Sequence, residues 1–140
     1  MEVNPYLNFK GQCEEAFTFY AQTFGGTIEA MIPHAGTPAA EHVGPDQQDK
    51  IMHARLKVGN AVFLGSDAPI QQYEKPAGFF VSLGIDQPAE ADRVFGALQE
   101  GGQVVMPLER TFWAERFGML IDRFGTPWMI NCQGDTTYEP

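Results

Sequence analysis

The chain has 140 residues, and nine Lys and Arg against 18 Asp and Glu give it a formal net charge of −9. A length of 140 residues predicts one domain, and 44% hydrophobic residues exclude general disorder. An acidic chain without a cluster of Lys and Arg lacks the surface that nucleic acids and anionic membranes require. We therefore expect neither kind of partner.

Targeting signals and disulfide patterns are not visible in the sequence. No apolar run approaches the roughly 20 residues that span a bilayer, and Met1 to Pro5 resemble no signal peptide. Cys13 and Cys132 lack CxxC spacing, which favours reduced thiols and a cytoplasmic protein. Eleven Phe and two Trp are a heavy load of rings. They predict either an aromatic core or a cavity with ring walls.

The first half of the chain is predicted to contain a strand, a helix and three further strands. Residues 3–9 alternate as a strand, and residues 12–24 carry apolar side chains at helical spacing up to Gly25-Gly26. Gly59-Asn60 is typical of a hairpin turn. Residues 33–50 hold Pro, Gly, Gln and Asp and predict a mobile connection. The three strands are expected at 27–32, 51–58 and 61–64.

The second half repeats this order. Residues 78–85 are expected to form a strand, and residues 88–100 a helix that ends at Gly101-Gly102. Three strands follow at 103–106, 116–122 and 127–132. Successive strands without intervening helices argue against a doubly wound α/β fold. We therefore predict an α+β fold of two βαβββ modules.

The modules are expected at residues 1–67 and 78–133 of a single domain spanning residues 1–140. A loop at 68–77 joins them, and residues 134–140 form a short tail. Each helix is expected to pack on its sheet through one apolar face. The residues that we assign to these faces are Phe17, Tyr20, Val94, Phe95 and Leu98.

Residues 111–122 are the segment most suggestive of a binding site, because Arg116 lies among aromatic residues. A guanidinium beside rings can stack on them and clamp an oxyanion with two parallel donors. Such a clamp would suit a carboxylate, phosphonate or enolate. In the alternative interpretation Arg116 pairs with Glu115 or Asp122, and the tryptophans belong to the core.

The histidines allow more than one interpretation. His53 lies within a predicted strand, where it could bind a metal, act as a general base or be structural. His34 and His42, with Glu41, lie in a loop without the tight spacing of a zinc site. The chain lacks GxSxG, P-loop and GxGxxG motifs. This argues against serine hydrolysis, phosphoryl transfer, dinucleotide chemistry and a Rossmann-type methyltransferase.

Several blocks of the chain are similar to one known family. The blocks are 4–9, 13–17, 24–26, 52–56, 113–118 and 122–125, together with Trp128. They resemble the PhnB-like branch of the vicinal-oxygen-chelate superfamily, which includes glyoxalase I, bleomycin-resistance proteins and extradiol dioxygenases. This resemblance covers nearly the whole chain.

The resemblance implies a cupped, half-open mixed sheet with outer helices and a homodimer with exchanged or shared modules. Members that use a metal place His or Glu on the first and last strands of each module. Met129 stands where such members have Glu, and His53 and Asp67 could hold a metal only if they converged. We therefore predict no metal and no other cofactor, with a divalent metal as the alternative.

The predicted function is the binding of a small ligand, an anion if Arg116 clamps it, by a cytoplasmic homodimer. The alternative is a metal-dependent lyase, isomerase or transferase of unknown substrate. A third possibility is a structural interaction module without a cavity. The demethylubiquinone methyltransferase label that members often carry has no support in the residues. The candidate ligand-binding residues are His53, Phe63, Trp113, Arg116, Phe117 and Trp128.

Overall fold

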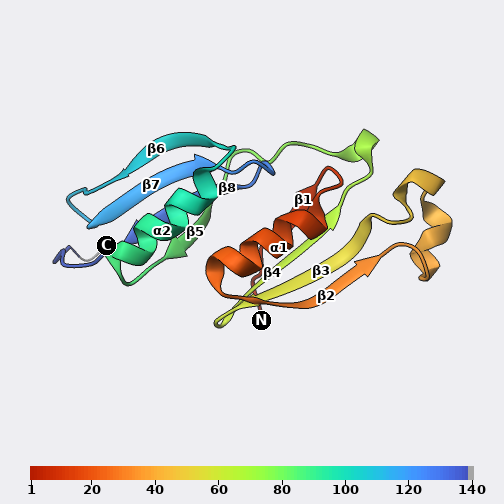
Figure 1. Cartoon of the computed structure of the whole chain (residues 1–140), viewed down its shortest axis with the longest axis horizontal. Helices are drawn as coiled ribbons and strands as arrows, with labels where there is room; N and C mark the ends of the chain where they lie inside the picture. Colours follow the sequence, from red (N-terminus) through yellow and green to blue (C-terminus); the bar gives the residue numbers. More distant parts are fainter. Residues whose placement is uncertain (139–140) are drawn as a thin grey trace. The chain divides into compact units, whose positions relative to one another are not determined.

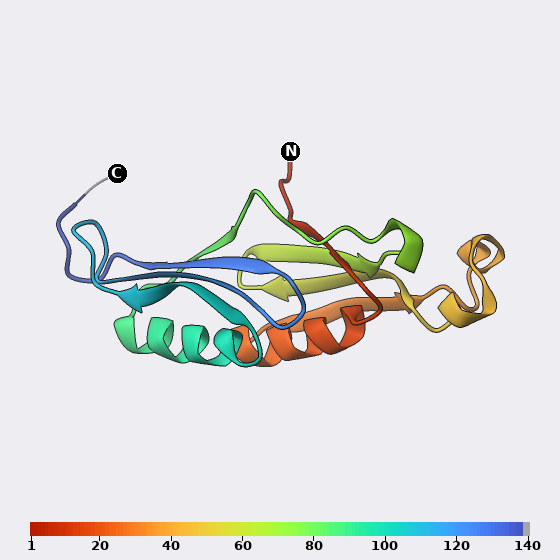
Figure 2. The same ribbon diagram turned by 90° about the horizontal axis from the view of Figure 1, so that it is seen from above.

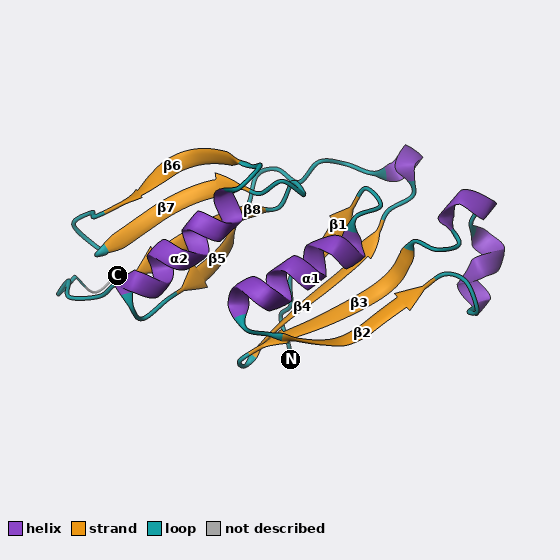
Figure 3. Ribbon diagram, in the orientation of Figure 1, coloured by secondary structure: helices purple, strands orange, loops and turns teal. Residues whose placement is uncertain are grey.

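The computed structural model describes residues 1–138, and the chain divides into two compact units. Unit 1 spans Met1–Glu74, and unit 2 spans Lys75–Pro140. Each unit contains one four-stranded sheet and one α-helix of 12 residues (Figures 1 and 3). Among the described residues no helix is long and apolar enough to cross a membrane.

The sheet of unit 1 has the strand order β1-β4-β3-β2. Strand β1 pairs with β4 in parallel, and the other neighbours are antiparallel. The helix follows the first strand, as the sequence predicts. The elements are β1 (Tyr6–Phe9), α1 (Cys13–Phe24), β2 (Thr27–Pro33), β3 (Ile51–Val58) and β4 (Ala61–Asp67).

Unit 2 repeats this topology with the strand order β5-β8-β7-β6. Strand β5 pairs with β8 in parallel, and the remaining neighbours are antiparallel. The predicted α+β fold of two βαβββ modules is therefore confirmed. The elements are β5 (Val81–Gly84), α2 (Pro88–Gln99), β6 (Gln103–Glu109), β7 (Arg116–Ile121) and β8 (Pro127–Cys132).

In each unit the helix lies along one face of its own sheet (Figure 2). Side chains alternate between the two faces of a strand, so every second residue points toward the helix. In β3 the helix-facing residues Ala54 and Leu56 are fully buried, whereas His53 and Arg55, on either side of Ala54, stay partly exposed. The five residues assigned to the helix faces from the sequence are all buried: Phe17, Tyr20, Val94, Phe95 and Leu98.

The two Gly-Gly pairs share one explanation: the first glycine adopts a left-handed φ, and the second permits a close approach of the backbone. Gly25 takes a left-handed φ of 70° and ends α1, which a glycine does without strain. A Cβ on Gly26 would lie 2.8 Å from the carbonyl oxygen of Lys57, so only glycine permits this approach of β2 to β3. Gly101 has a φ of 71°, and a Cβ on Gly102 would meet the carbonyl oxygen of Ile121.

Some boundaries differ from the sequence-based prediction. The strand predicted at 3–9 begins only at Tyr6, and the one predicted at 78–85 is confined to Val81–Gly84. Both are edge strands, and each pairs with one neighbour only. Three other strands are longer than predicted, because β2 continues to Pro33, β4 to Asp67 and β6 to Glu109.

The segment 33–50 contains local structure that the sequence analysis does not assign. It contains two short 3-10 helices, Pro38–His42 and Pro45–Gln47. The side-chain amide of Gln48 donates hydrogen bonds to the carbonyl oxygens of Ala40 at 2.9 Å and Val43 at 3.1 Å. The Pro and Gly residues of segment 33–50 therefore form turns in a folded connection.

Candidate functional site

A pocket of about 340 Å³ lies in unit 2. Three sheet strands, the β6–β7 connection and the C-terminal segment contribute to its walls. The residues that line it are Ser82, Gly84, Trp113, Phe117, Met129, Asn131, Gln133 and Tyr138.

Strand alternation explains which side chains reach this pocket. In β8, Trp128, Ile130 and Cys132 are fully buried, while Met129 and Asn131 between them line the pocket. The pairing of Ser82 with Met129 and of Gly84 with Asn131 extends this set onto β5. The pocket therefore occupies the face of the second sheet opposite α2.

Aromatic rings form a connected wall at one end of the pocket. The rings of Trp113 and Phe117 meet edge to face with centroids 5.1 Å apart. The ring centroid of Phe112 lies 4.9 Å from that of Trp113 and 5.4 Å from that of Tyr138. The hydroxyl oxygen of Thr111 accepts hydrogen bonds from the backbone N–H of Trp113 at 3.3 Å and of Ala114 at 3.1 Å. These bonds fix the backbone at Trp113.

The C-terminal segment is fastened to the same wall. The Thr136 hydroxyl lies 3.2 Å from the carbonyl oxygen of Trp113, and Gln133 donates its side-chain N–H to the carbonyl oxygen of Tyr138 at 2.9 Å. Arg110 forms an ion pair of 2.9 Å with Asp135, and its hydrogen bond lowers the pKa of that carboxyl. These contacts bring Tyr138 to the edge of the pocket.

Arg116 does not lie in this pocket. Its Nε donates to Oδ1 of Asp92 on α2 at 2.9 Å, and its Nη1 donates to the carbonyl oxygen of Glu115 at 3.0 Å. The guanidinium therefore lies on the helix side of β7. The structure supports neither the predicted oxyanion clamp nor the alternative pairings with the carboxylates of Glu115 or Asp122.

Trp128 and Phe63 belong to the cores of their units. Trp128 is fully buried and donates its indole N–H to Oδ2 of Asp122 at 2.8 Å. Phe63 is 4% exposed, and its ring centroid lies 6.1 Å from that of Phe24. We therefore correct their assignment from cavity wall to hydrophobic core.

His53 lies on the face of the first sheet opposite α1. It is half-buried, and its Nδ1 lies 3.3 Å from the hydroxyl oxygen of Tyr6. The two rings have centroids 5.9 Å apart. Of the six candidates, Trp113 and Phe117 line this pocket of the described residues together, and the other four do not line it.

Asp67 is occupied by the backbone of unit 1. Its Oδ1 accepts the N–H of Cys13 at 2.9 Å, and its Oδ2 accepts the N–H of Ile51 at 2.8 Å. It is buried on the helix side of β4, whereas His53 lies on the opposite face of the sheet. Asp67 and His53 therefore do not converge.

The side chains that could ligate a divalent metal are not grouped in the described part of the chain. Residues 1–138 contain no group of three or more His, Cys, Asp and Glu placed to hold one. Ser82, Met129 and Asn131 offer the pocket a hydroxyl, a thioether and an amide, whereas catalytic divalent cations favour imidazole and carboxylate ligands. His34, considered above with His42 and Glu41, has its Nδ1 3.0 Å from the carbonyl oxygen of Lys50.

Both cysteines are free and buried. Burial, reinforced by the nearby Asp67, raises the pKa of Cys13 far above its usual range. Burial and the negative charge of Glu115 also raise the pKa of Cys132. Because the thiolate is the reactive form, neither residue is suited to act as a nucleophile.

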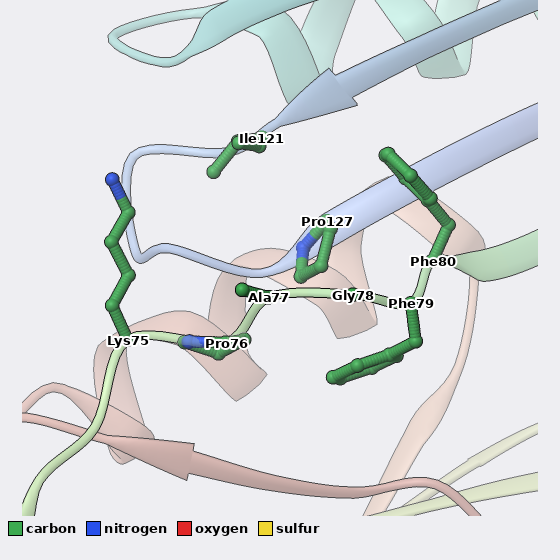
Figure 4. A pocket seen from close by; sticks show the side chains of 8 residues that line it. All are labelled: Lys75, Pro76, Ala77, Gly78, Phe79, Phe80, Ile121 and Pro127. Atoms are coloured by element: carbon green, nitrogen blue, oxygen red, sulfur yellow. The ribbon is translucent and has the colours of Figure 1, made fainter.

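A second hollow of about 370 Å³ lies at the beginning of unit 2 (Figure 4). Its walls are apolar apart from Lys75, and Ile121 and Pro127 lie across from residues 75–80. The lining residues are Lys75, Pro76, Ala77, Gly78, Phe79, Phe80, Ile121 and Pro127.

Residues 1–131 match the model of a protein family described as 3-demethylubiquinone-9 3-methyltransferase. The chain belongs to this family. It is 50% identical to protein PA1353 from Pseudomonas aeruginosa, with a TM-score of 0.88 over 96% of this chain and 99% of that one. It is 33% identical to protein YjdN from Escherichia coli, covering 94% of this chain and 95% of the relative.

More distant structures show the same fold. A Bacillus cereus structure described as a putative 3-demethylubiquinone-9 3-methyltransferase, PhnB protein, has 23% identity and a TM-score of 0.80 over 94% of this chain and 99% of that one. A glyoxalase/bleomycin resistance protein/dioxygenase family enzyme from Burkholderia phytofirmans has 14% identity and a TM-score of 0.61, covering 93% and 96%. The fold that the resemblance to the vicinal-oxygen-chelate superfamily implies is thereby confirmed.

Several pocket residues were missed as ligand-binding candidates from the sequence: Ser82, Gly84, Met129, Asn131, Gln133 and Tyr138. Alternation within β5 and β8 could have identified Ser82, Met129 and Asn131, once the buried face of each strand was assigned. Tyr138 follows the last strand and carries no periodic signal. Its place depends on side-chain contacts that the sequence pattern does not reveal.

Proposed function

We propose that the protein binds a small molecule in the pocket beside Trp113 and Phe117. The observation that supports this proposal is a concave site with aromatic walls and a few uncharged polar groups. Ligand pockets commonly combine apolar walls with a small number of polar groups that orient the ligand. The activity in the family's description is not part of the proposal, which rests on the pocket alone.

The pocket's size and lining favour a ligand portion of one or two rings. Its volume of about 340 Å³ is near the lower end of the common range of about 300–1,000 Å³. Trp113 and Phe117 offer ring surfaces, and Ser82, Asn131 and Gln133 can donate and accept hydrogen bonds.

The proposal includes no catalytic metal. The donor set around Met129 and Asn131 does not suit one, whereas a vicinal-oxygen-chelate enzyme would need a metal to stabilise developing negative charge. Elemental analysis of the purified protein should find divalent metal well below one ion per chain. Stoichiometric zinc, nickel, manganese or iron would favour the alternative, a metal-dependent lyase, isomerase or transferase.

We also propose a cytoplasmic homodimer. Exposed apolar side chains on edge strand β6 and the adjoining connection support an interface: Val104, Val105, Met106 and Phe112. The two free thiols of Cys13 and Cys132 suit a reducing compartment.

The test is a screen of one- and two-ring fragments by thermal shift and by NMR. We expect several fragments to raise the melting temperature, because a ligand that binds only the folded state stabilises it. Phe117→Ala should weaken these hits, whereas Phe79→Ala, in the second hollow, should leave them unchanged. If no fragment binds, or if the hits are insensitive to Phe117→Ala, the proposed pocket is not the binding site.

A further inference from the structure

We infer that this pocket selects a flat ring that is uncharged or positively charged, and that it rejects anions. This inference rests on the proposed function and narrows it to a ligand class. It reverses the sequence-based expectation of an anion held by Arg116. The charges in and around the pocket and the rings of its wall support this selectivity.

The lining of the pocket carries no formal charge. None of its eight described residues is Lys, Arg, His, Asp or Glu, and the polar members are a serine, two amides and a tyrosine. An anion that entered would lose hydration without meeting a cation, which is costly in a partly enclosed site. An uncharged ring carrying a hydroxyl or amine could replace its hydrogen bonds to water with hydrogen bonds to Asn131 or Gln133, without that cost.

Two arginines close in sequence to the wall residues Trp113 and Phe117 are already engaged. Arg116 forms an ion pair with Asp92 on the helix side of β7, at 2.9 Å. Arg110 forms an ion pair with Asp135 in the C-terminal segment, also at 2.9 Å. Either arginine would have to abandon a carboxylate and move to reach an anion in the pocket. Neither therefore provides a ready anion site.

The aromatic wall favours the opposite charge. The face of an aromatic ring is electron-rich and attracts cations, with Trp the strongest of the three ring types. Trp113 and Phe117 line the pocket, and Phe112 connects Trp113 to Tyr138. The net charge of −9 further raises the local concentration of cations and repels anions.

The test compares three probes that share one ring system: 1-naphthylmethanol, 1-naphthylmethylammonium and 1-naphthylacetate. Binding is followed by NMR through the indole N–H signal of Trp113, assigned with Trp113→Phe. We expect the alcohol and the ammonium to bind at least about tenfold more tightly than the acetate, a difference of about 1.4 kcal/mol. High salt should preserve most of this preference, because salt screens the distant charges of the protein more than it screens interactions inside the pocket.

A gain-of-function variant adds a second criterion. Ser82→Lys places an ammonium at the pocket edge and should strengthen acetate binding by about tenfold or more, as expected for a charged hydrogen bond. Ser66→Lys, on strand β4 of unit 1, is the matched control and should have no such effect. Lys75→Gln removes the cation of the second hollow and should not change the Trp113 signal.

The outcomes separate the two proposals. If the acetate shifts the Trp113 signal as tightly as the alcohol does, the charge selectivity is wrong while ligand binding in the pocket stands. If none of the three probes shifts this signal at its solubility limit, both the selectivity and the proposed pocket are contradicted. If Ser82→Lys leaves acetate binding unchanged, Ser82 does not face the bound ring, and the inferred site is overturned.

Discussion

Arg116 and Phe117 are consecutive residues of β7, so strand alternation directs them to opposite faces of the sheet. Phe117 lines the pocket, and Arg116 reaches Asp92 on α2. The sequence analysis assigns both residues to one cavity, and this assignment conflicts with strand alternation. Alternation alone could have separated them, but it could not have identified a partner 24 positions away in sequence.

Asp122 organises the turn that precedes β8. Its Oδ1 accepts the backbone N–H groups of Phe124 at 2.9 Å and Thr126 at 3.0 Å, and its Oδ2 accepts the indole N–H of Trp128. Asp122→Ala leaves these buried donors without this acceptor. We expect the free energy of unfolding to fall by about 3 kcal/mol or more, measured by chemical denaturation.

Two further variants separate these bonds. Asp122→Asn keeps one acceptor oxygen and should cost less than Asp122→Ala, while Trp128→Phe removes the indole donor. In a double-mutant cycle, Asp122→Ala and Trp128→Phe should be non-additive, because each removes the same hydrogen bond. Additive losses would show that this contact does not stabilise the turn.

The raised pKa values of Cys13 and Cys132 predict slow thiol chemistry. In the native protein, neither thiol should react quickly with a disulfide reagent near pH 8, whereas both should react at once in denaturant. The pKa of each thiol is higher in the folded state than in the unfolded state. Its contribution to the free energy of unfolding is therefore full below the unfolded pKa of about 8.5 and falls as the pH rises above that value. Rapid labelling of the native protein at neutral pH would contradict this.

At the scale of elements, the sequence predicted the helices closely. Both predicted helices agree with α1 and α2 within one residue at each end. Their apolar faces and the Gly-Gly pairs are local signals that do not depend on tertiary contacts. Edge strands β1 and β5 were predicted too long, because a strand's ends depend on its neighbour rather than on its own sequence.

The C-terminal segment is an element that the sequence presents only as a tail. Ending the chain after Gln133 removes Tyr138 from the pocket and Thr136 from its contact with Trp113. We expect 1-naphthylmethanol to bind about twofold to tenfold more weakly, as expected for a lost ring contact, measured by the same NMR titration. The segment's residues 139 and 140 lie outside the described part of the chain.

Asp135→Asn is the milder control for this truncation. It removes the exposed ion pair with Arg110 but keeps Tyr138, so binding should change little. The lowered pKa of Asp135 means that this pair persists at neutral pH and is lost only as the pH falls through that lowered value. Equal affinities for the full and truncated chains would show that the segment takes no part in binding.

At the scale of the whole molecule, the repeated βαβββ topology explains how 140 residues form two sheets, each covered by a helix on one face. Val104, Val105 and Met106 remain 40%, 47% and 41% exposed on edge strand β6. Sedimentation equilibrium should therefore give about twice the 15.5 kDa chain mass, because a partner would cover this apolar surface. A monomer at micromolar concentration would contradict the proposed homodimer.

The most direct test of the account uses the protein's two tryptophans in one NMR titration with 1-naphthylmethanol. Trp113 lines the pocket, whereas Trp128 is buried and hydrogen-bonded to Asp122 on the other side of the sheet. We predict a saturable shift of the Trp113 indole N–H signal while the Trp128 signal stays in place. A saturable shift of Trp128 alone, or of neither signal, would contradict ligand binding in this pocket.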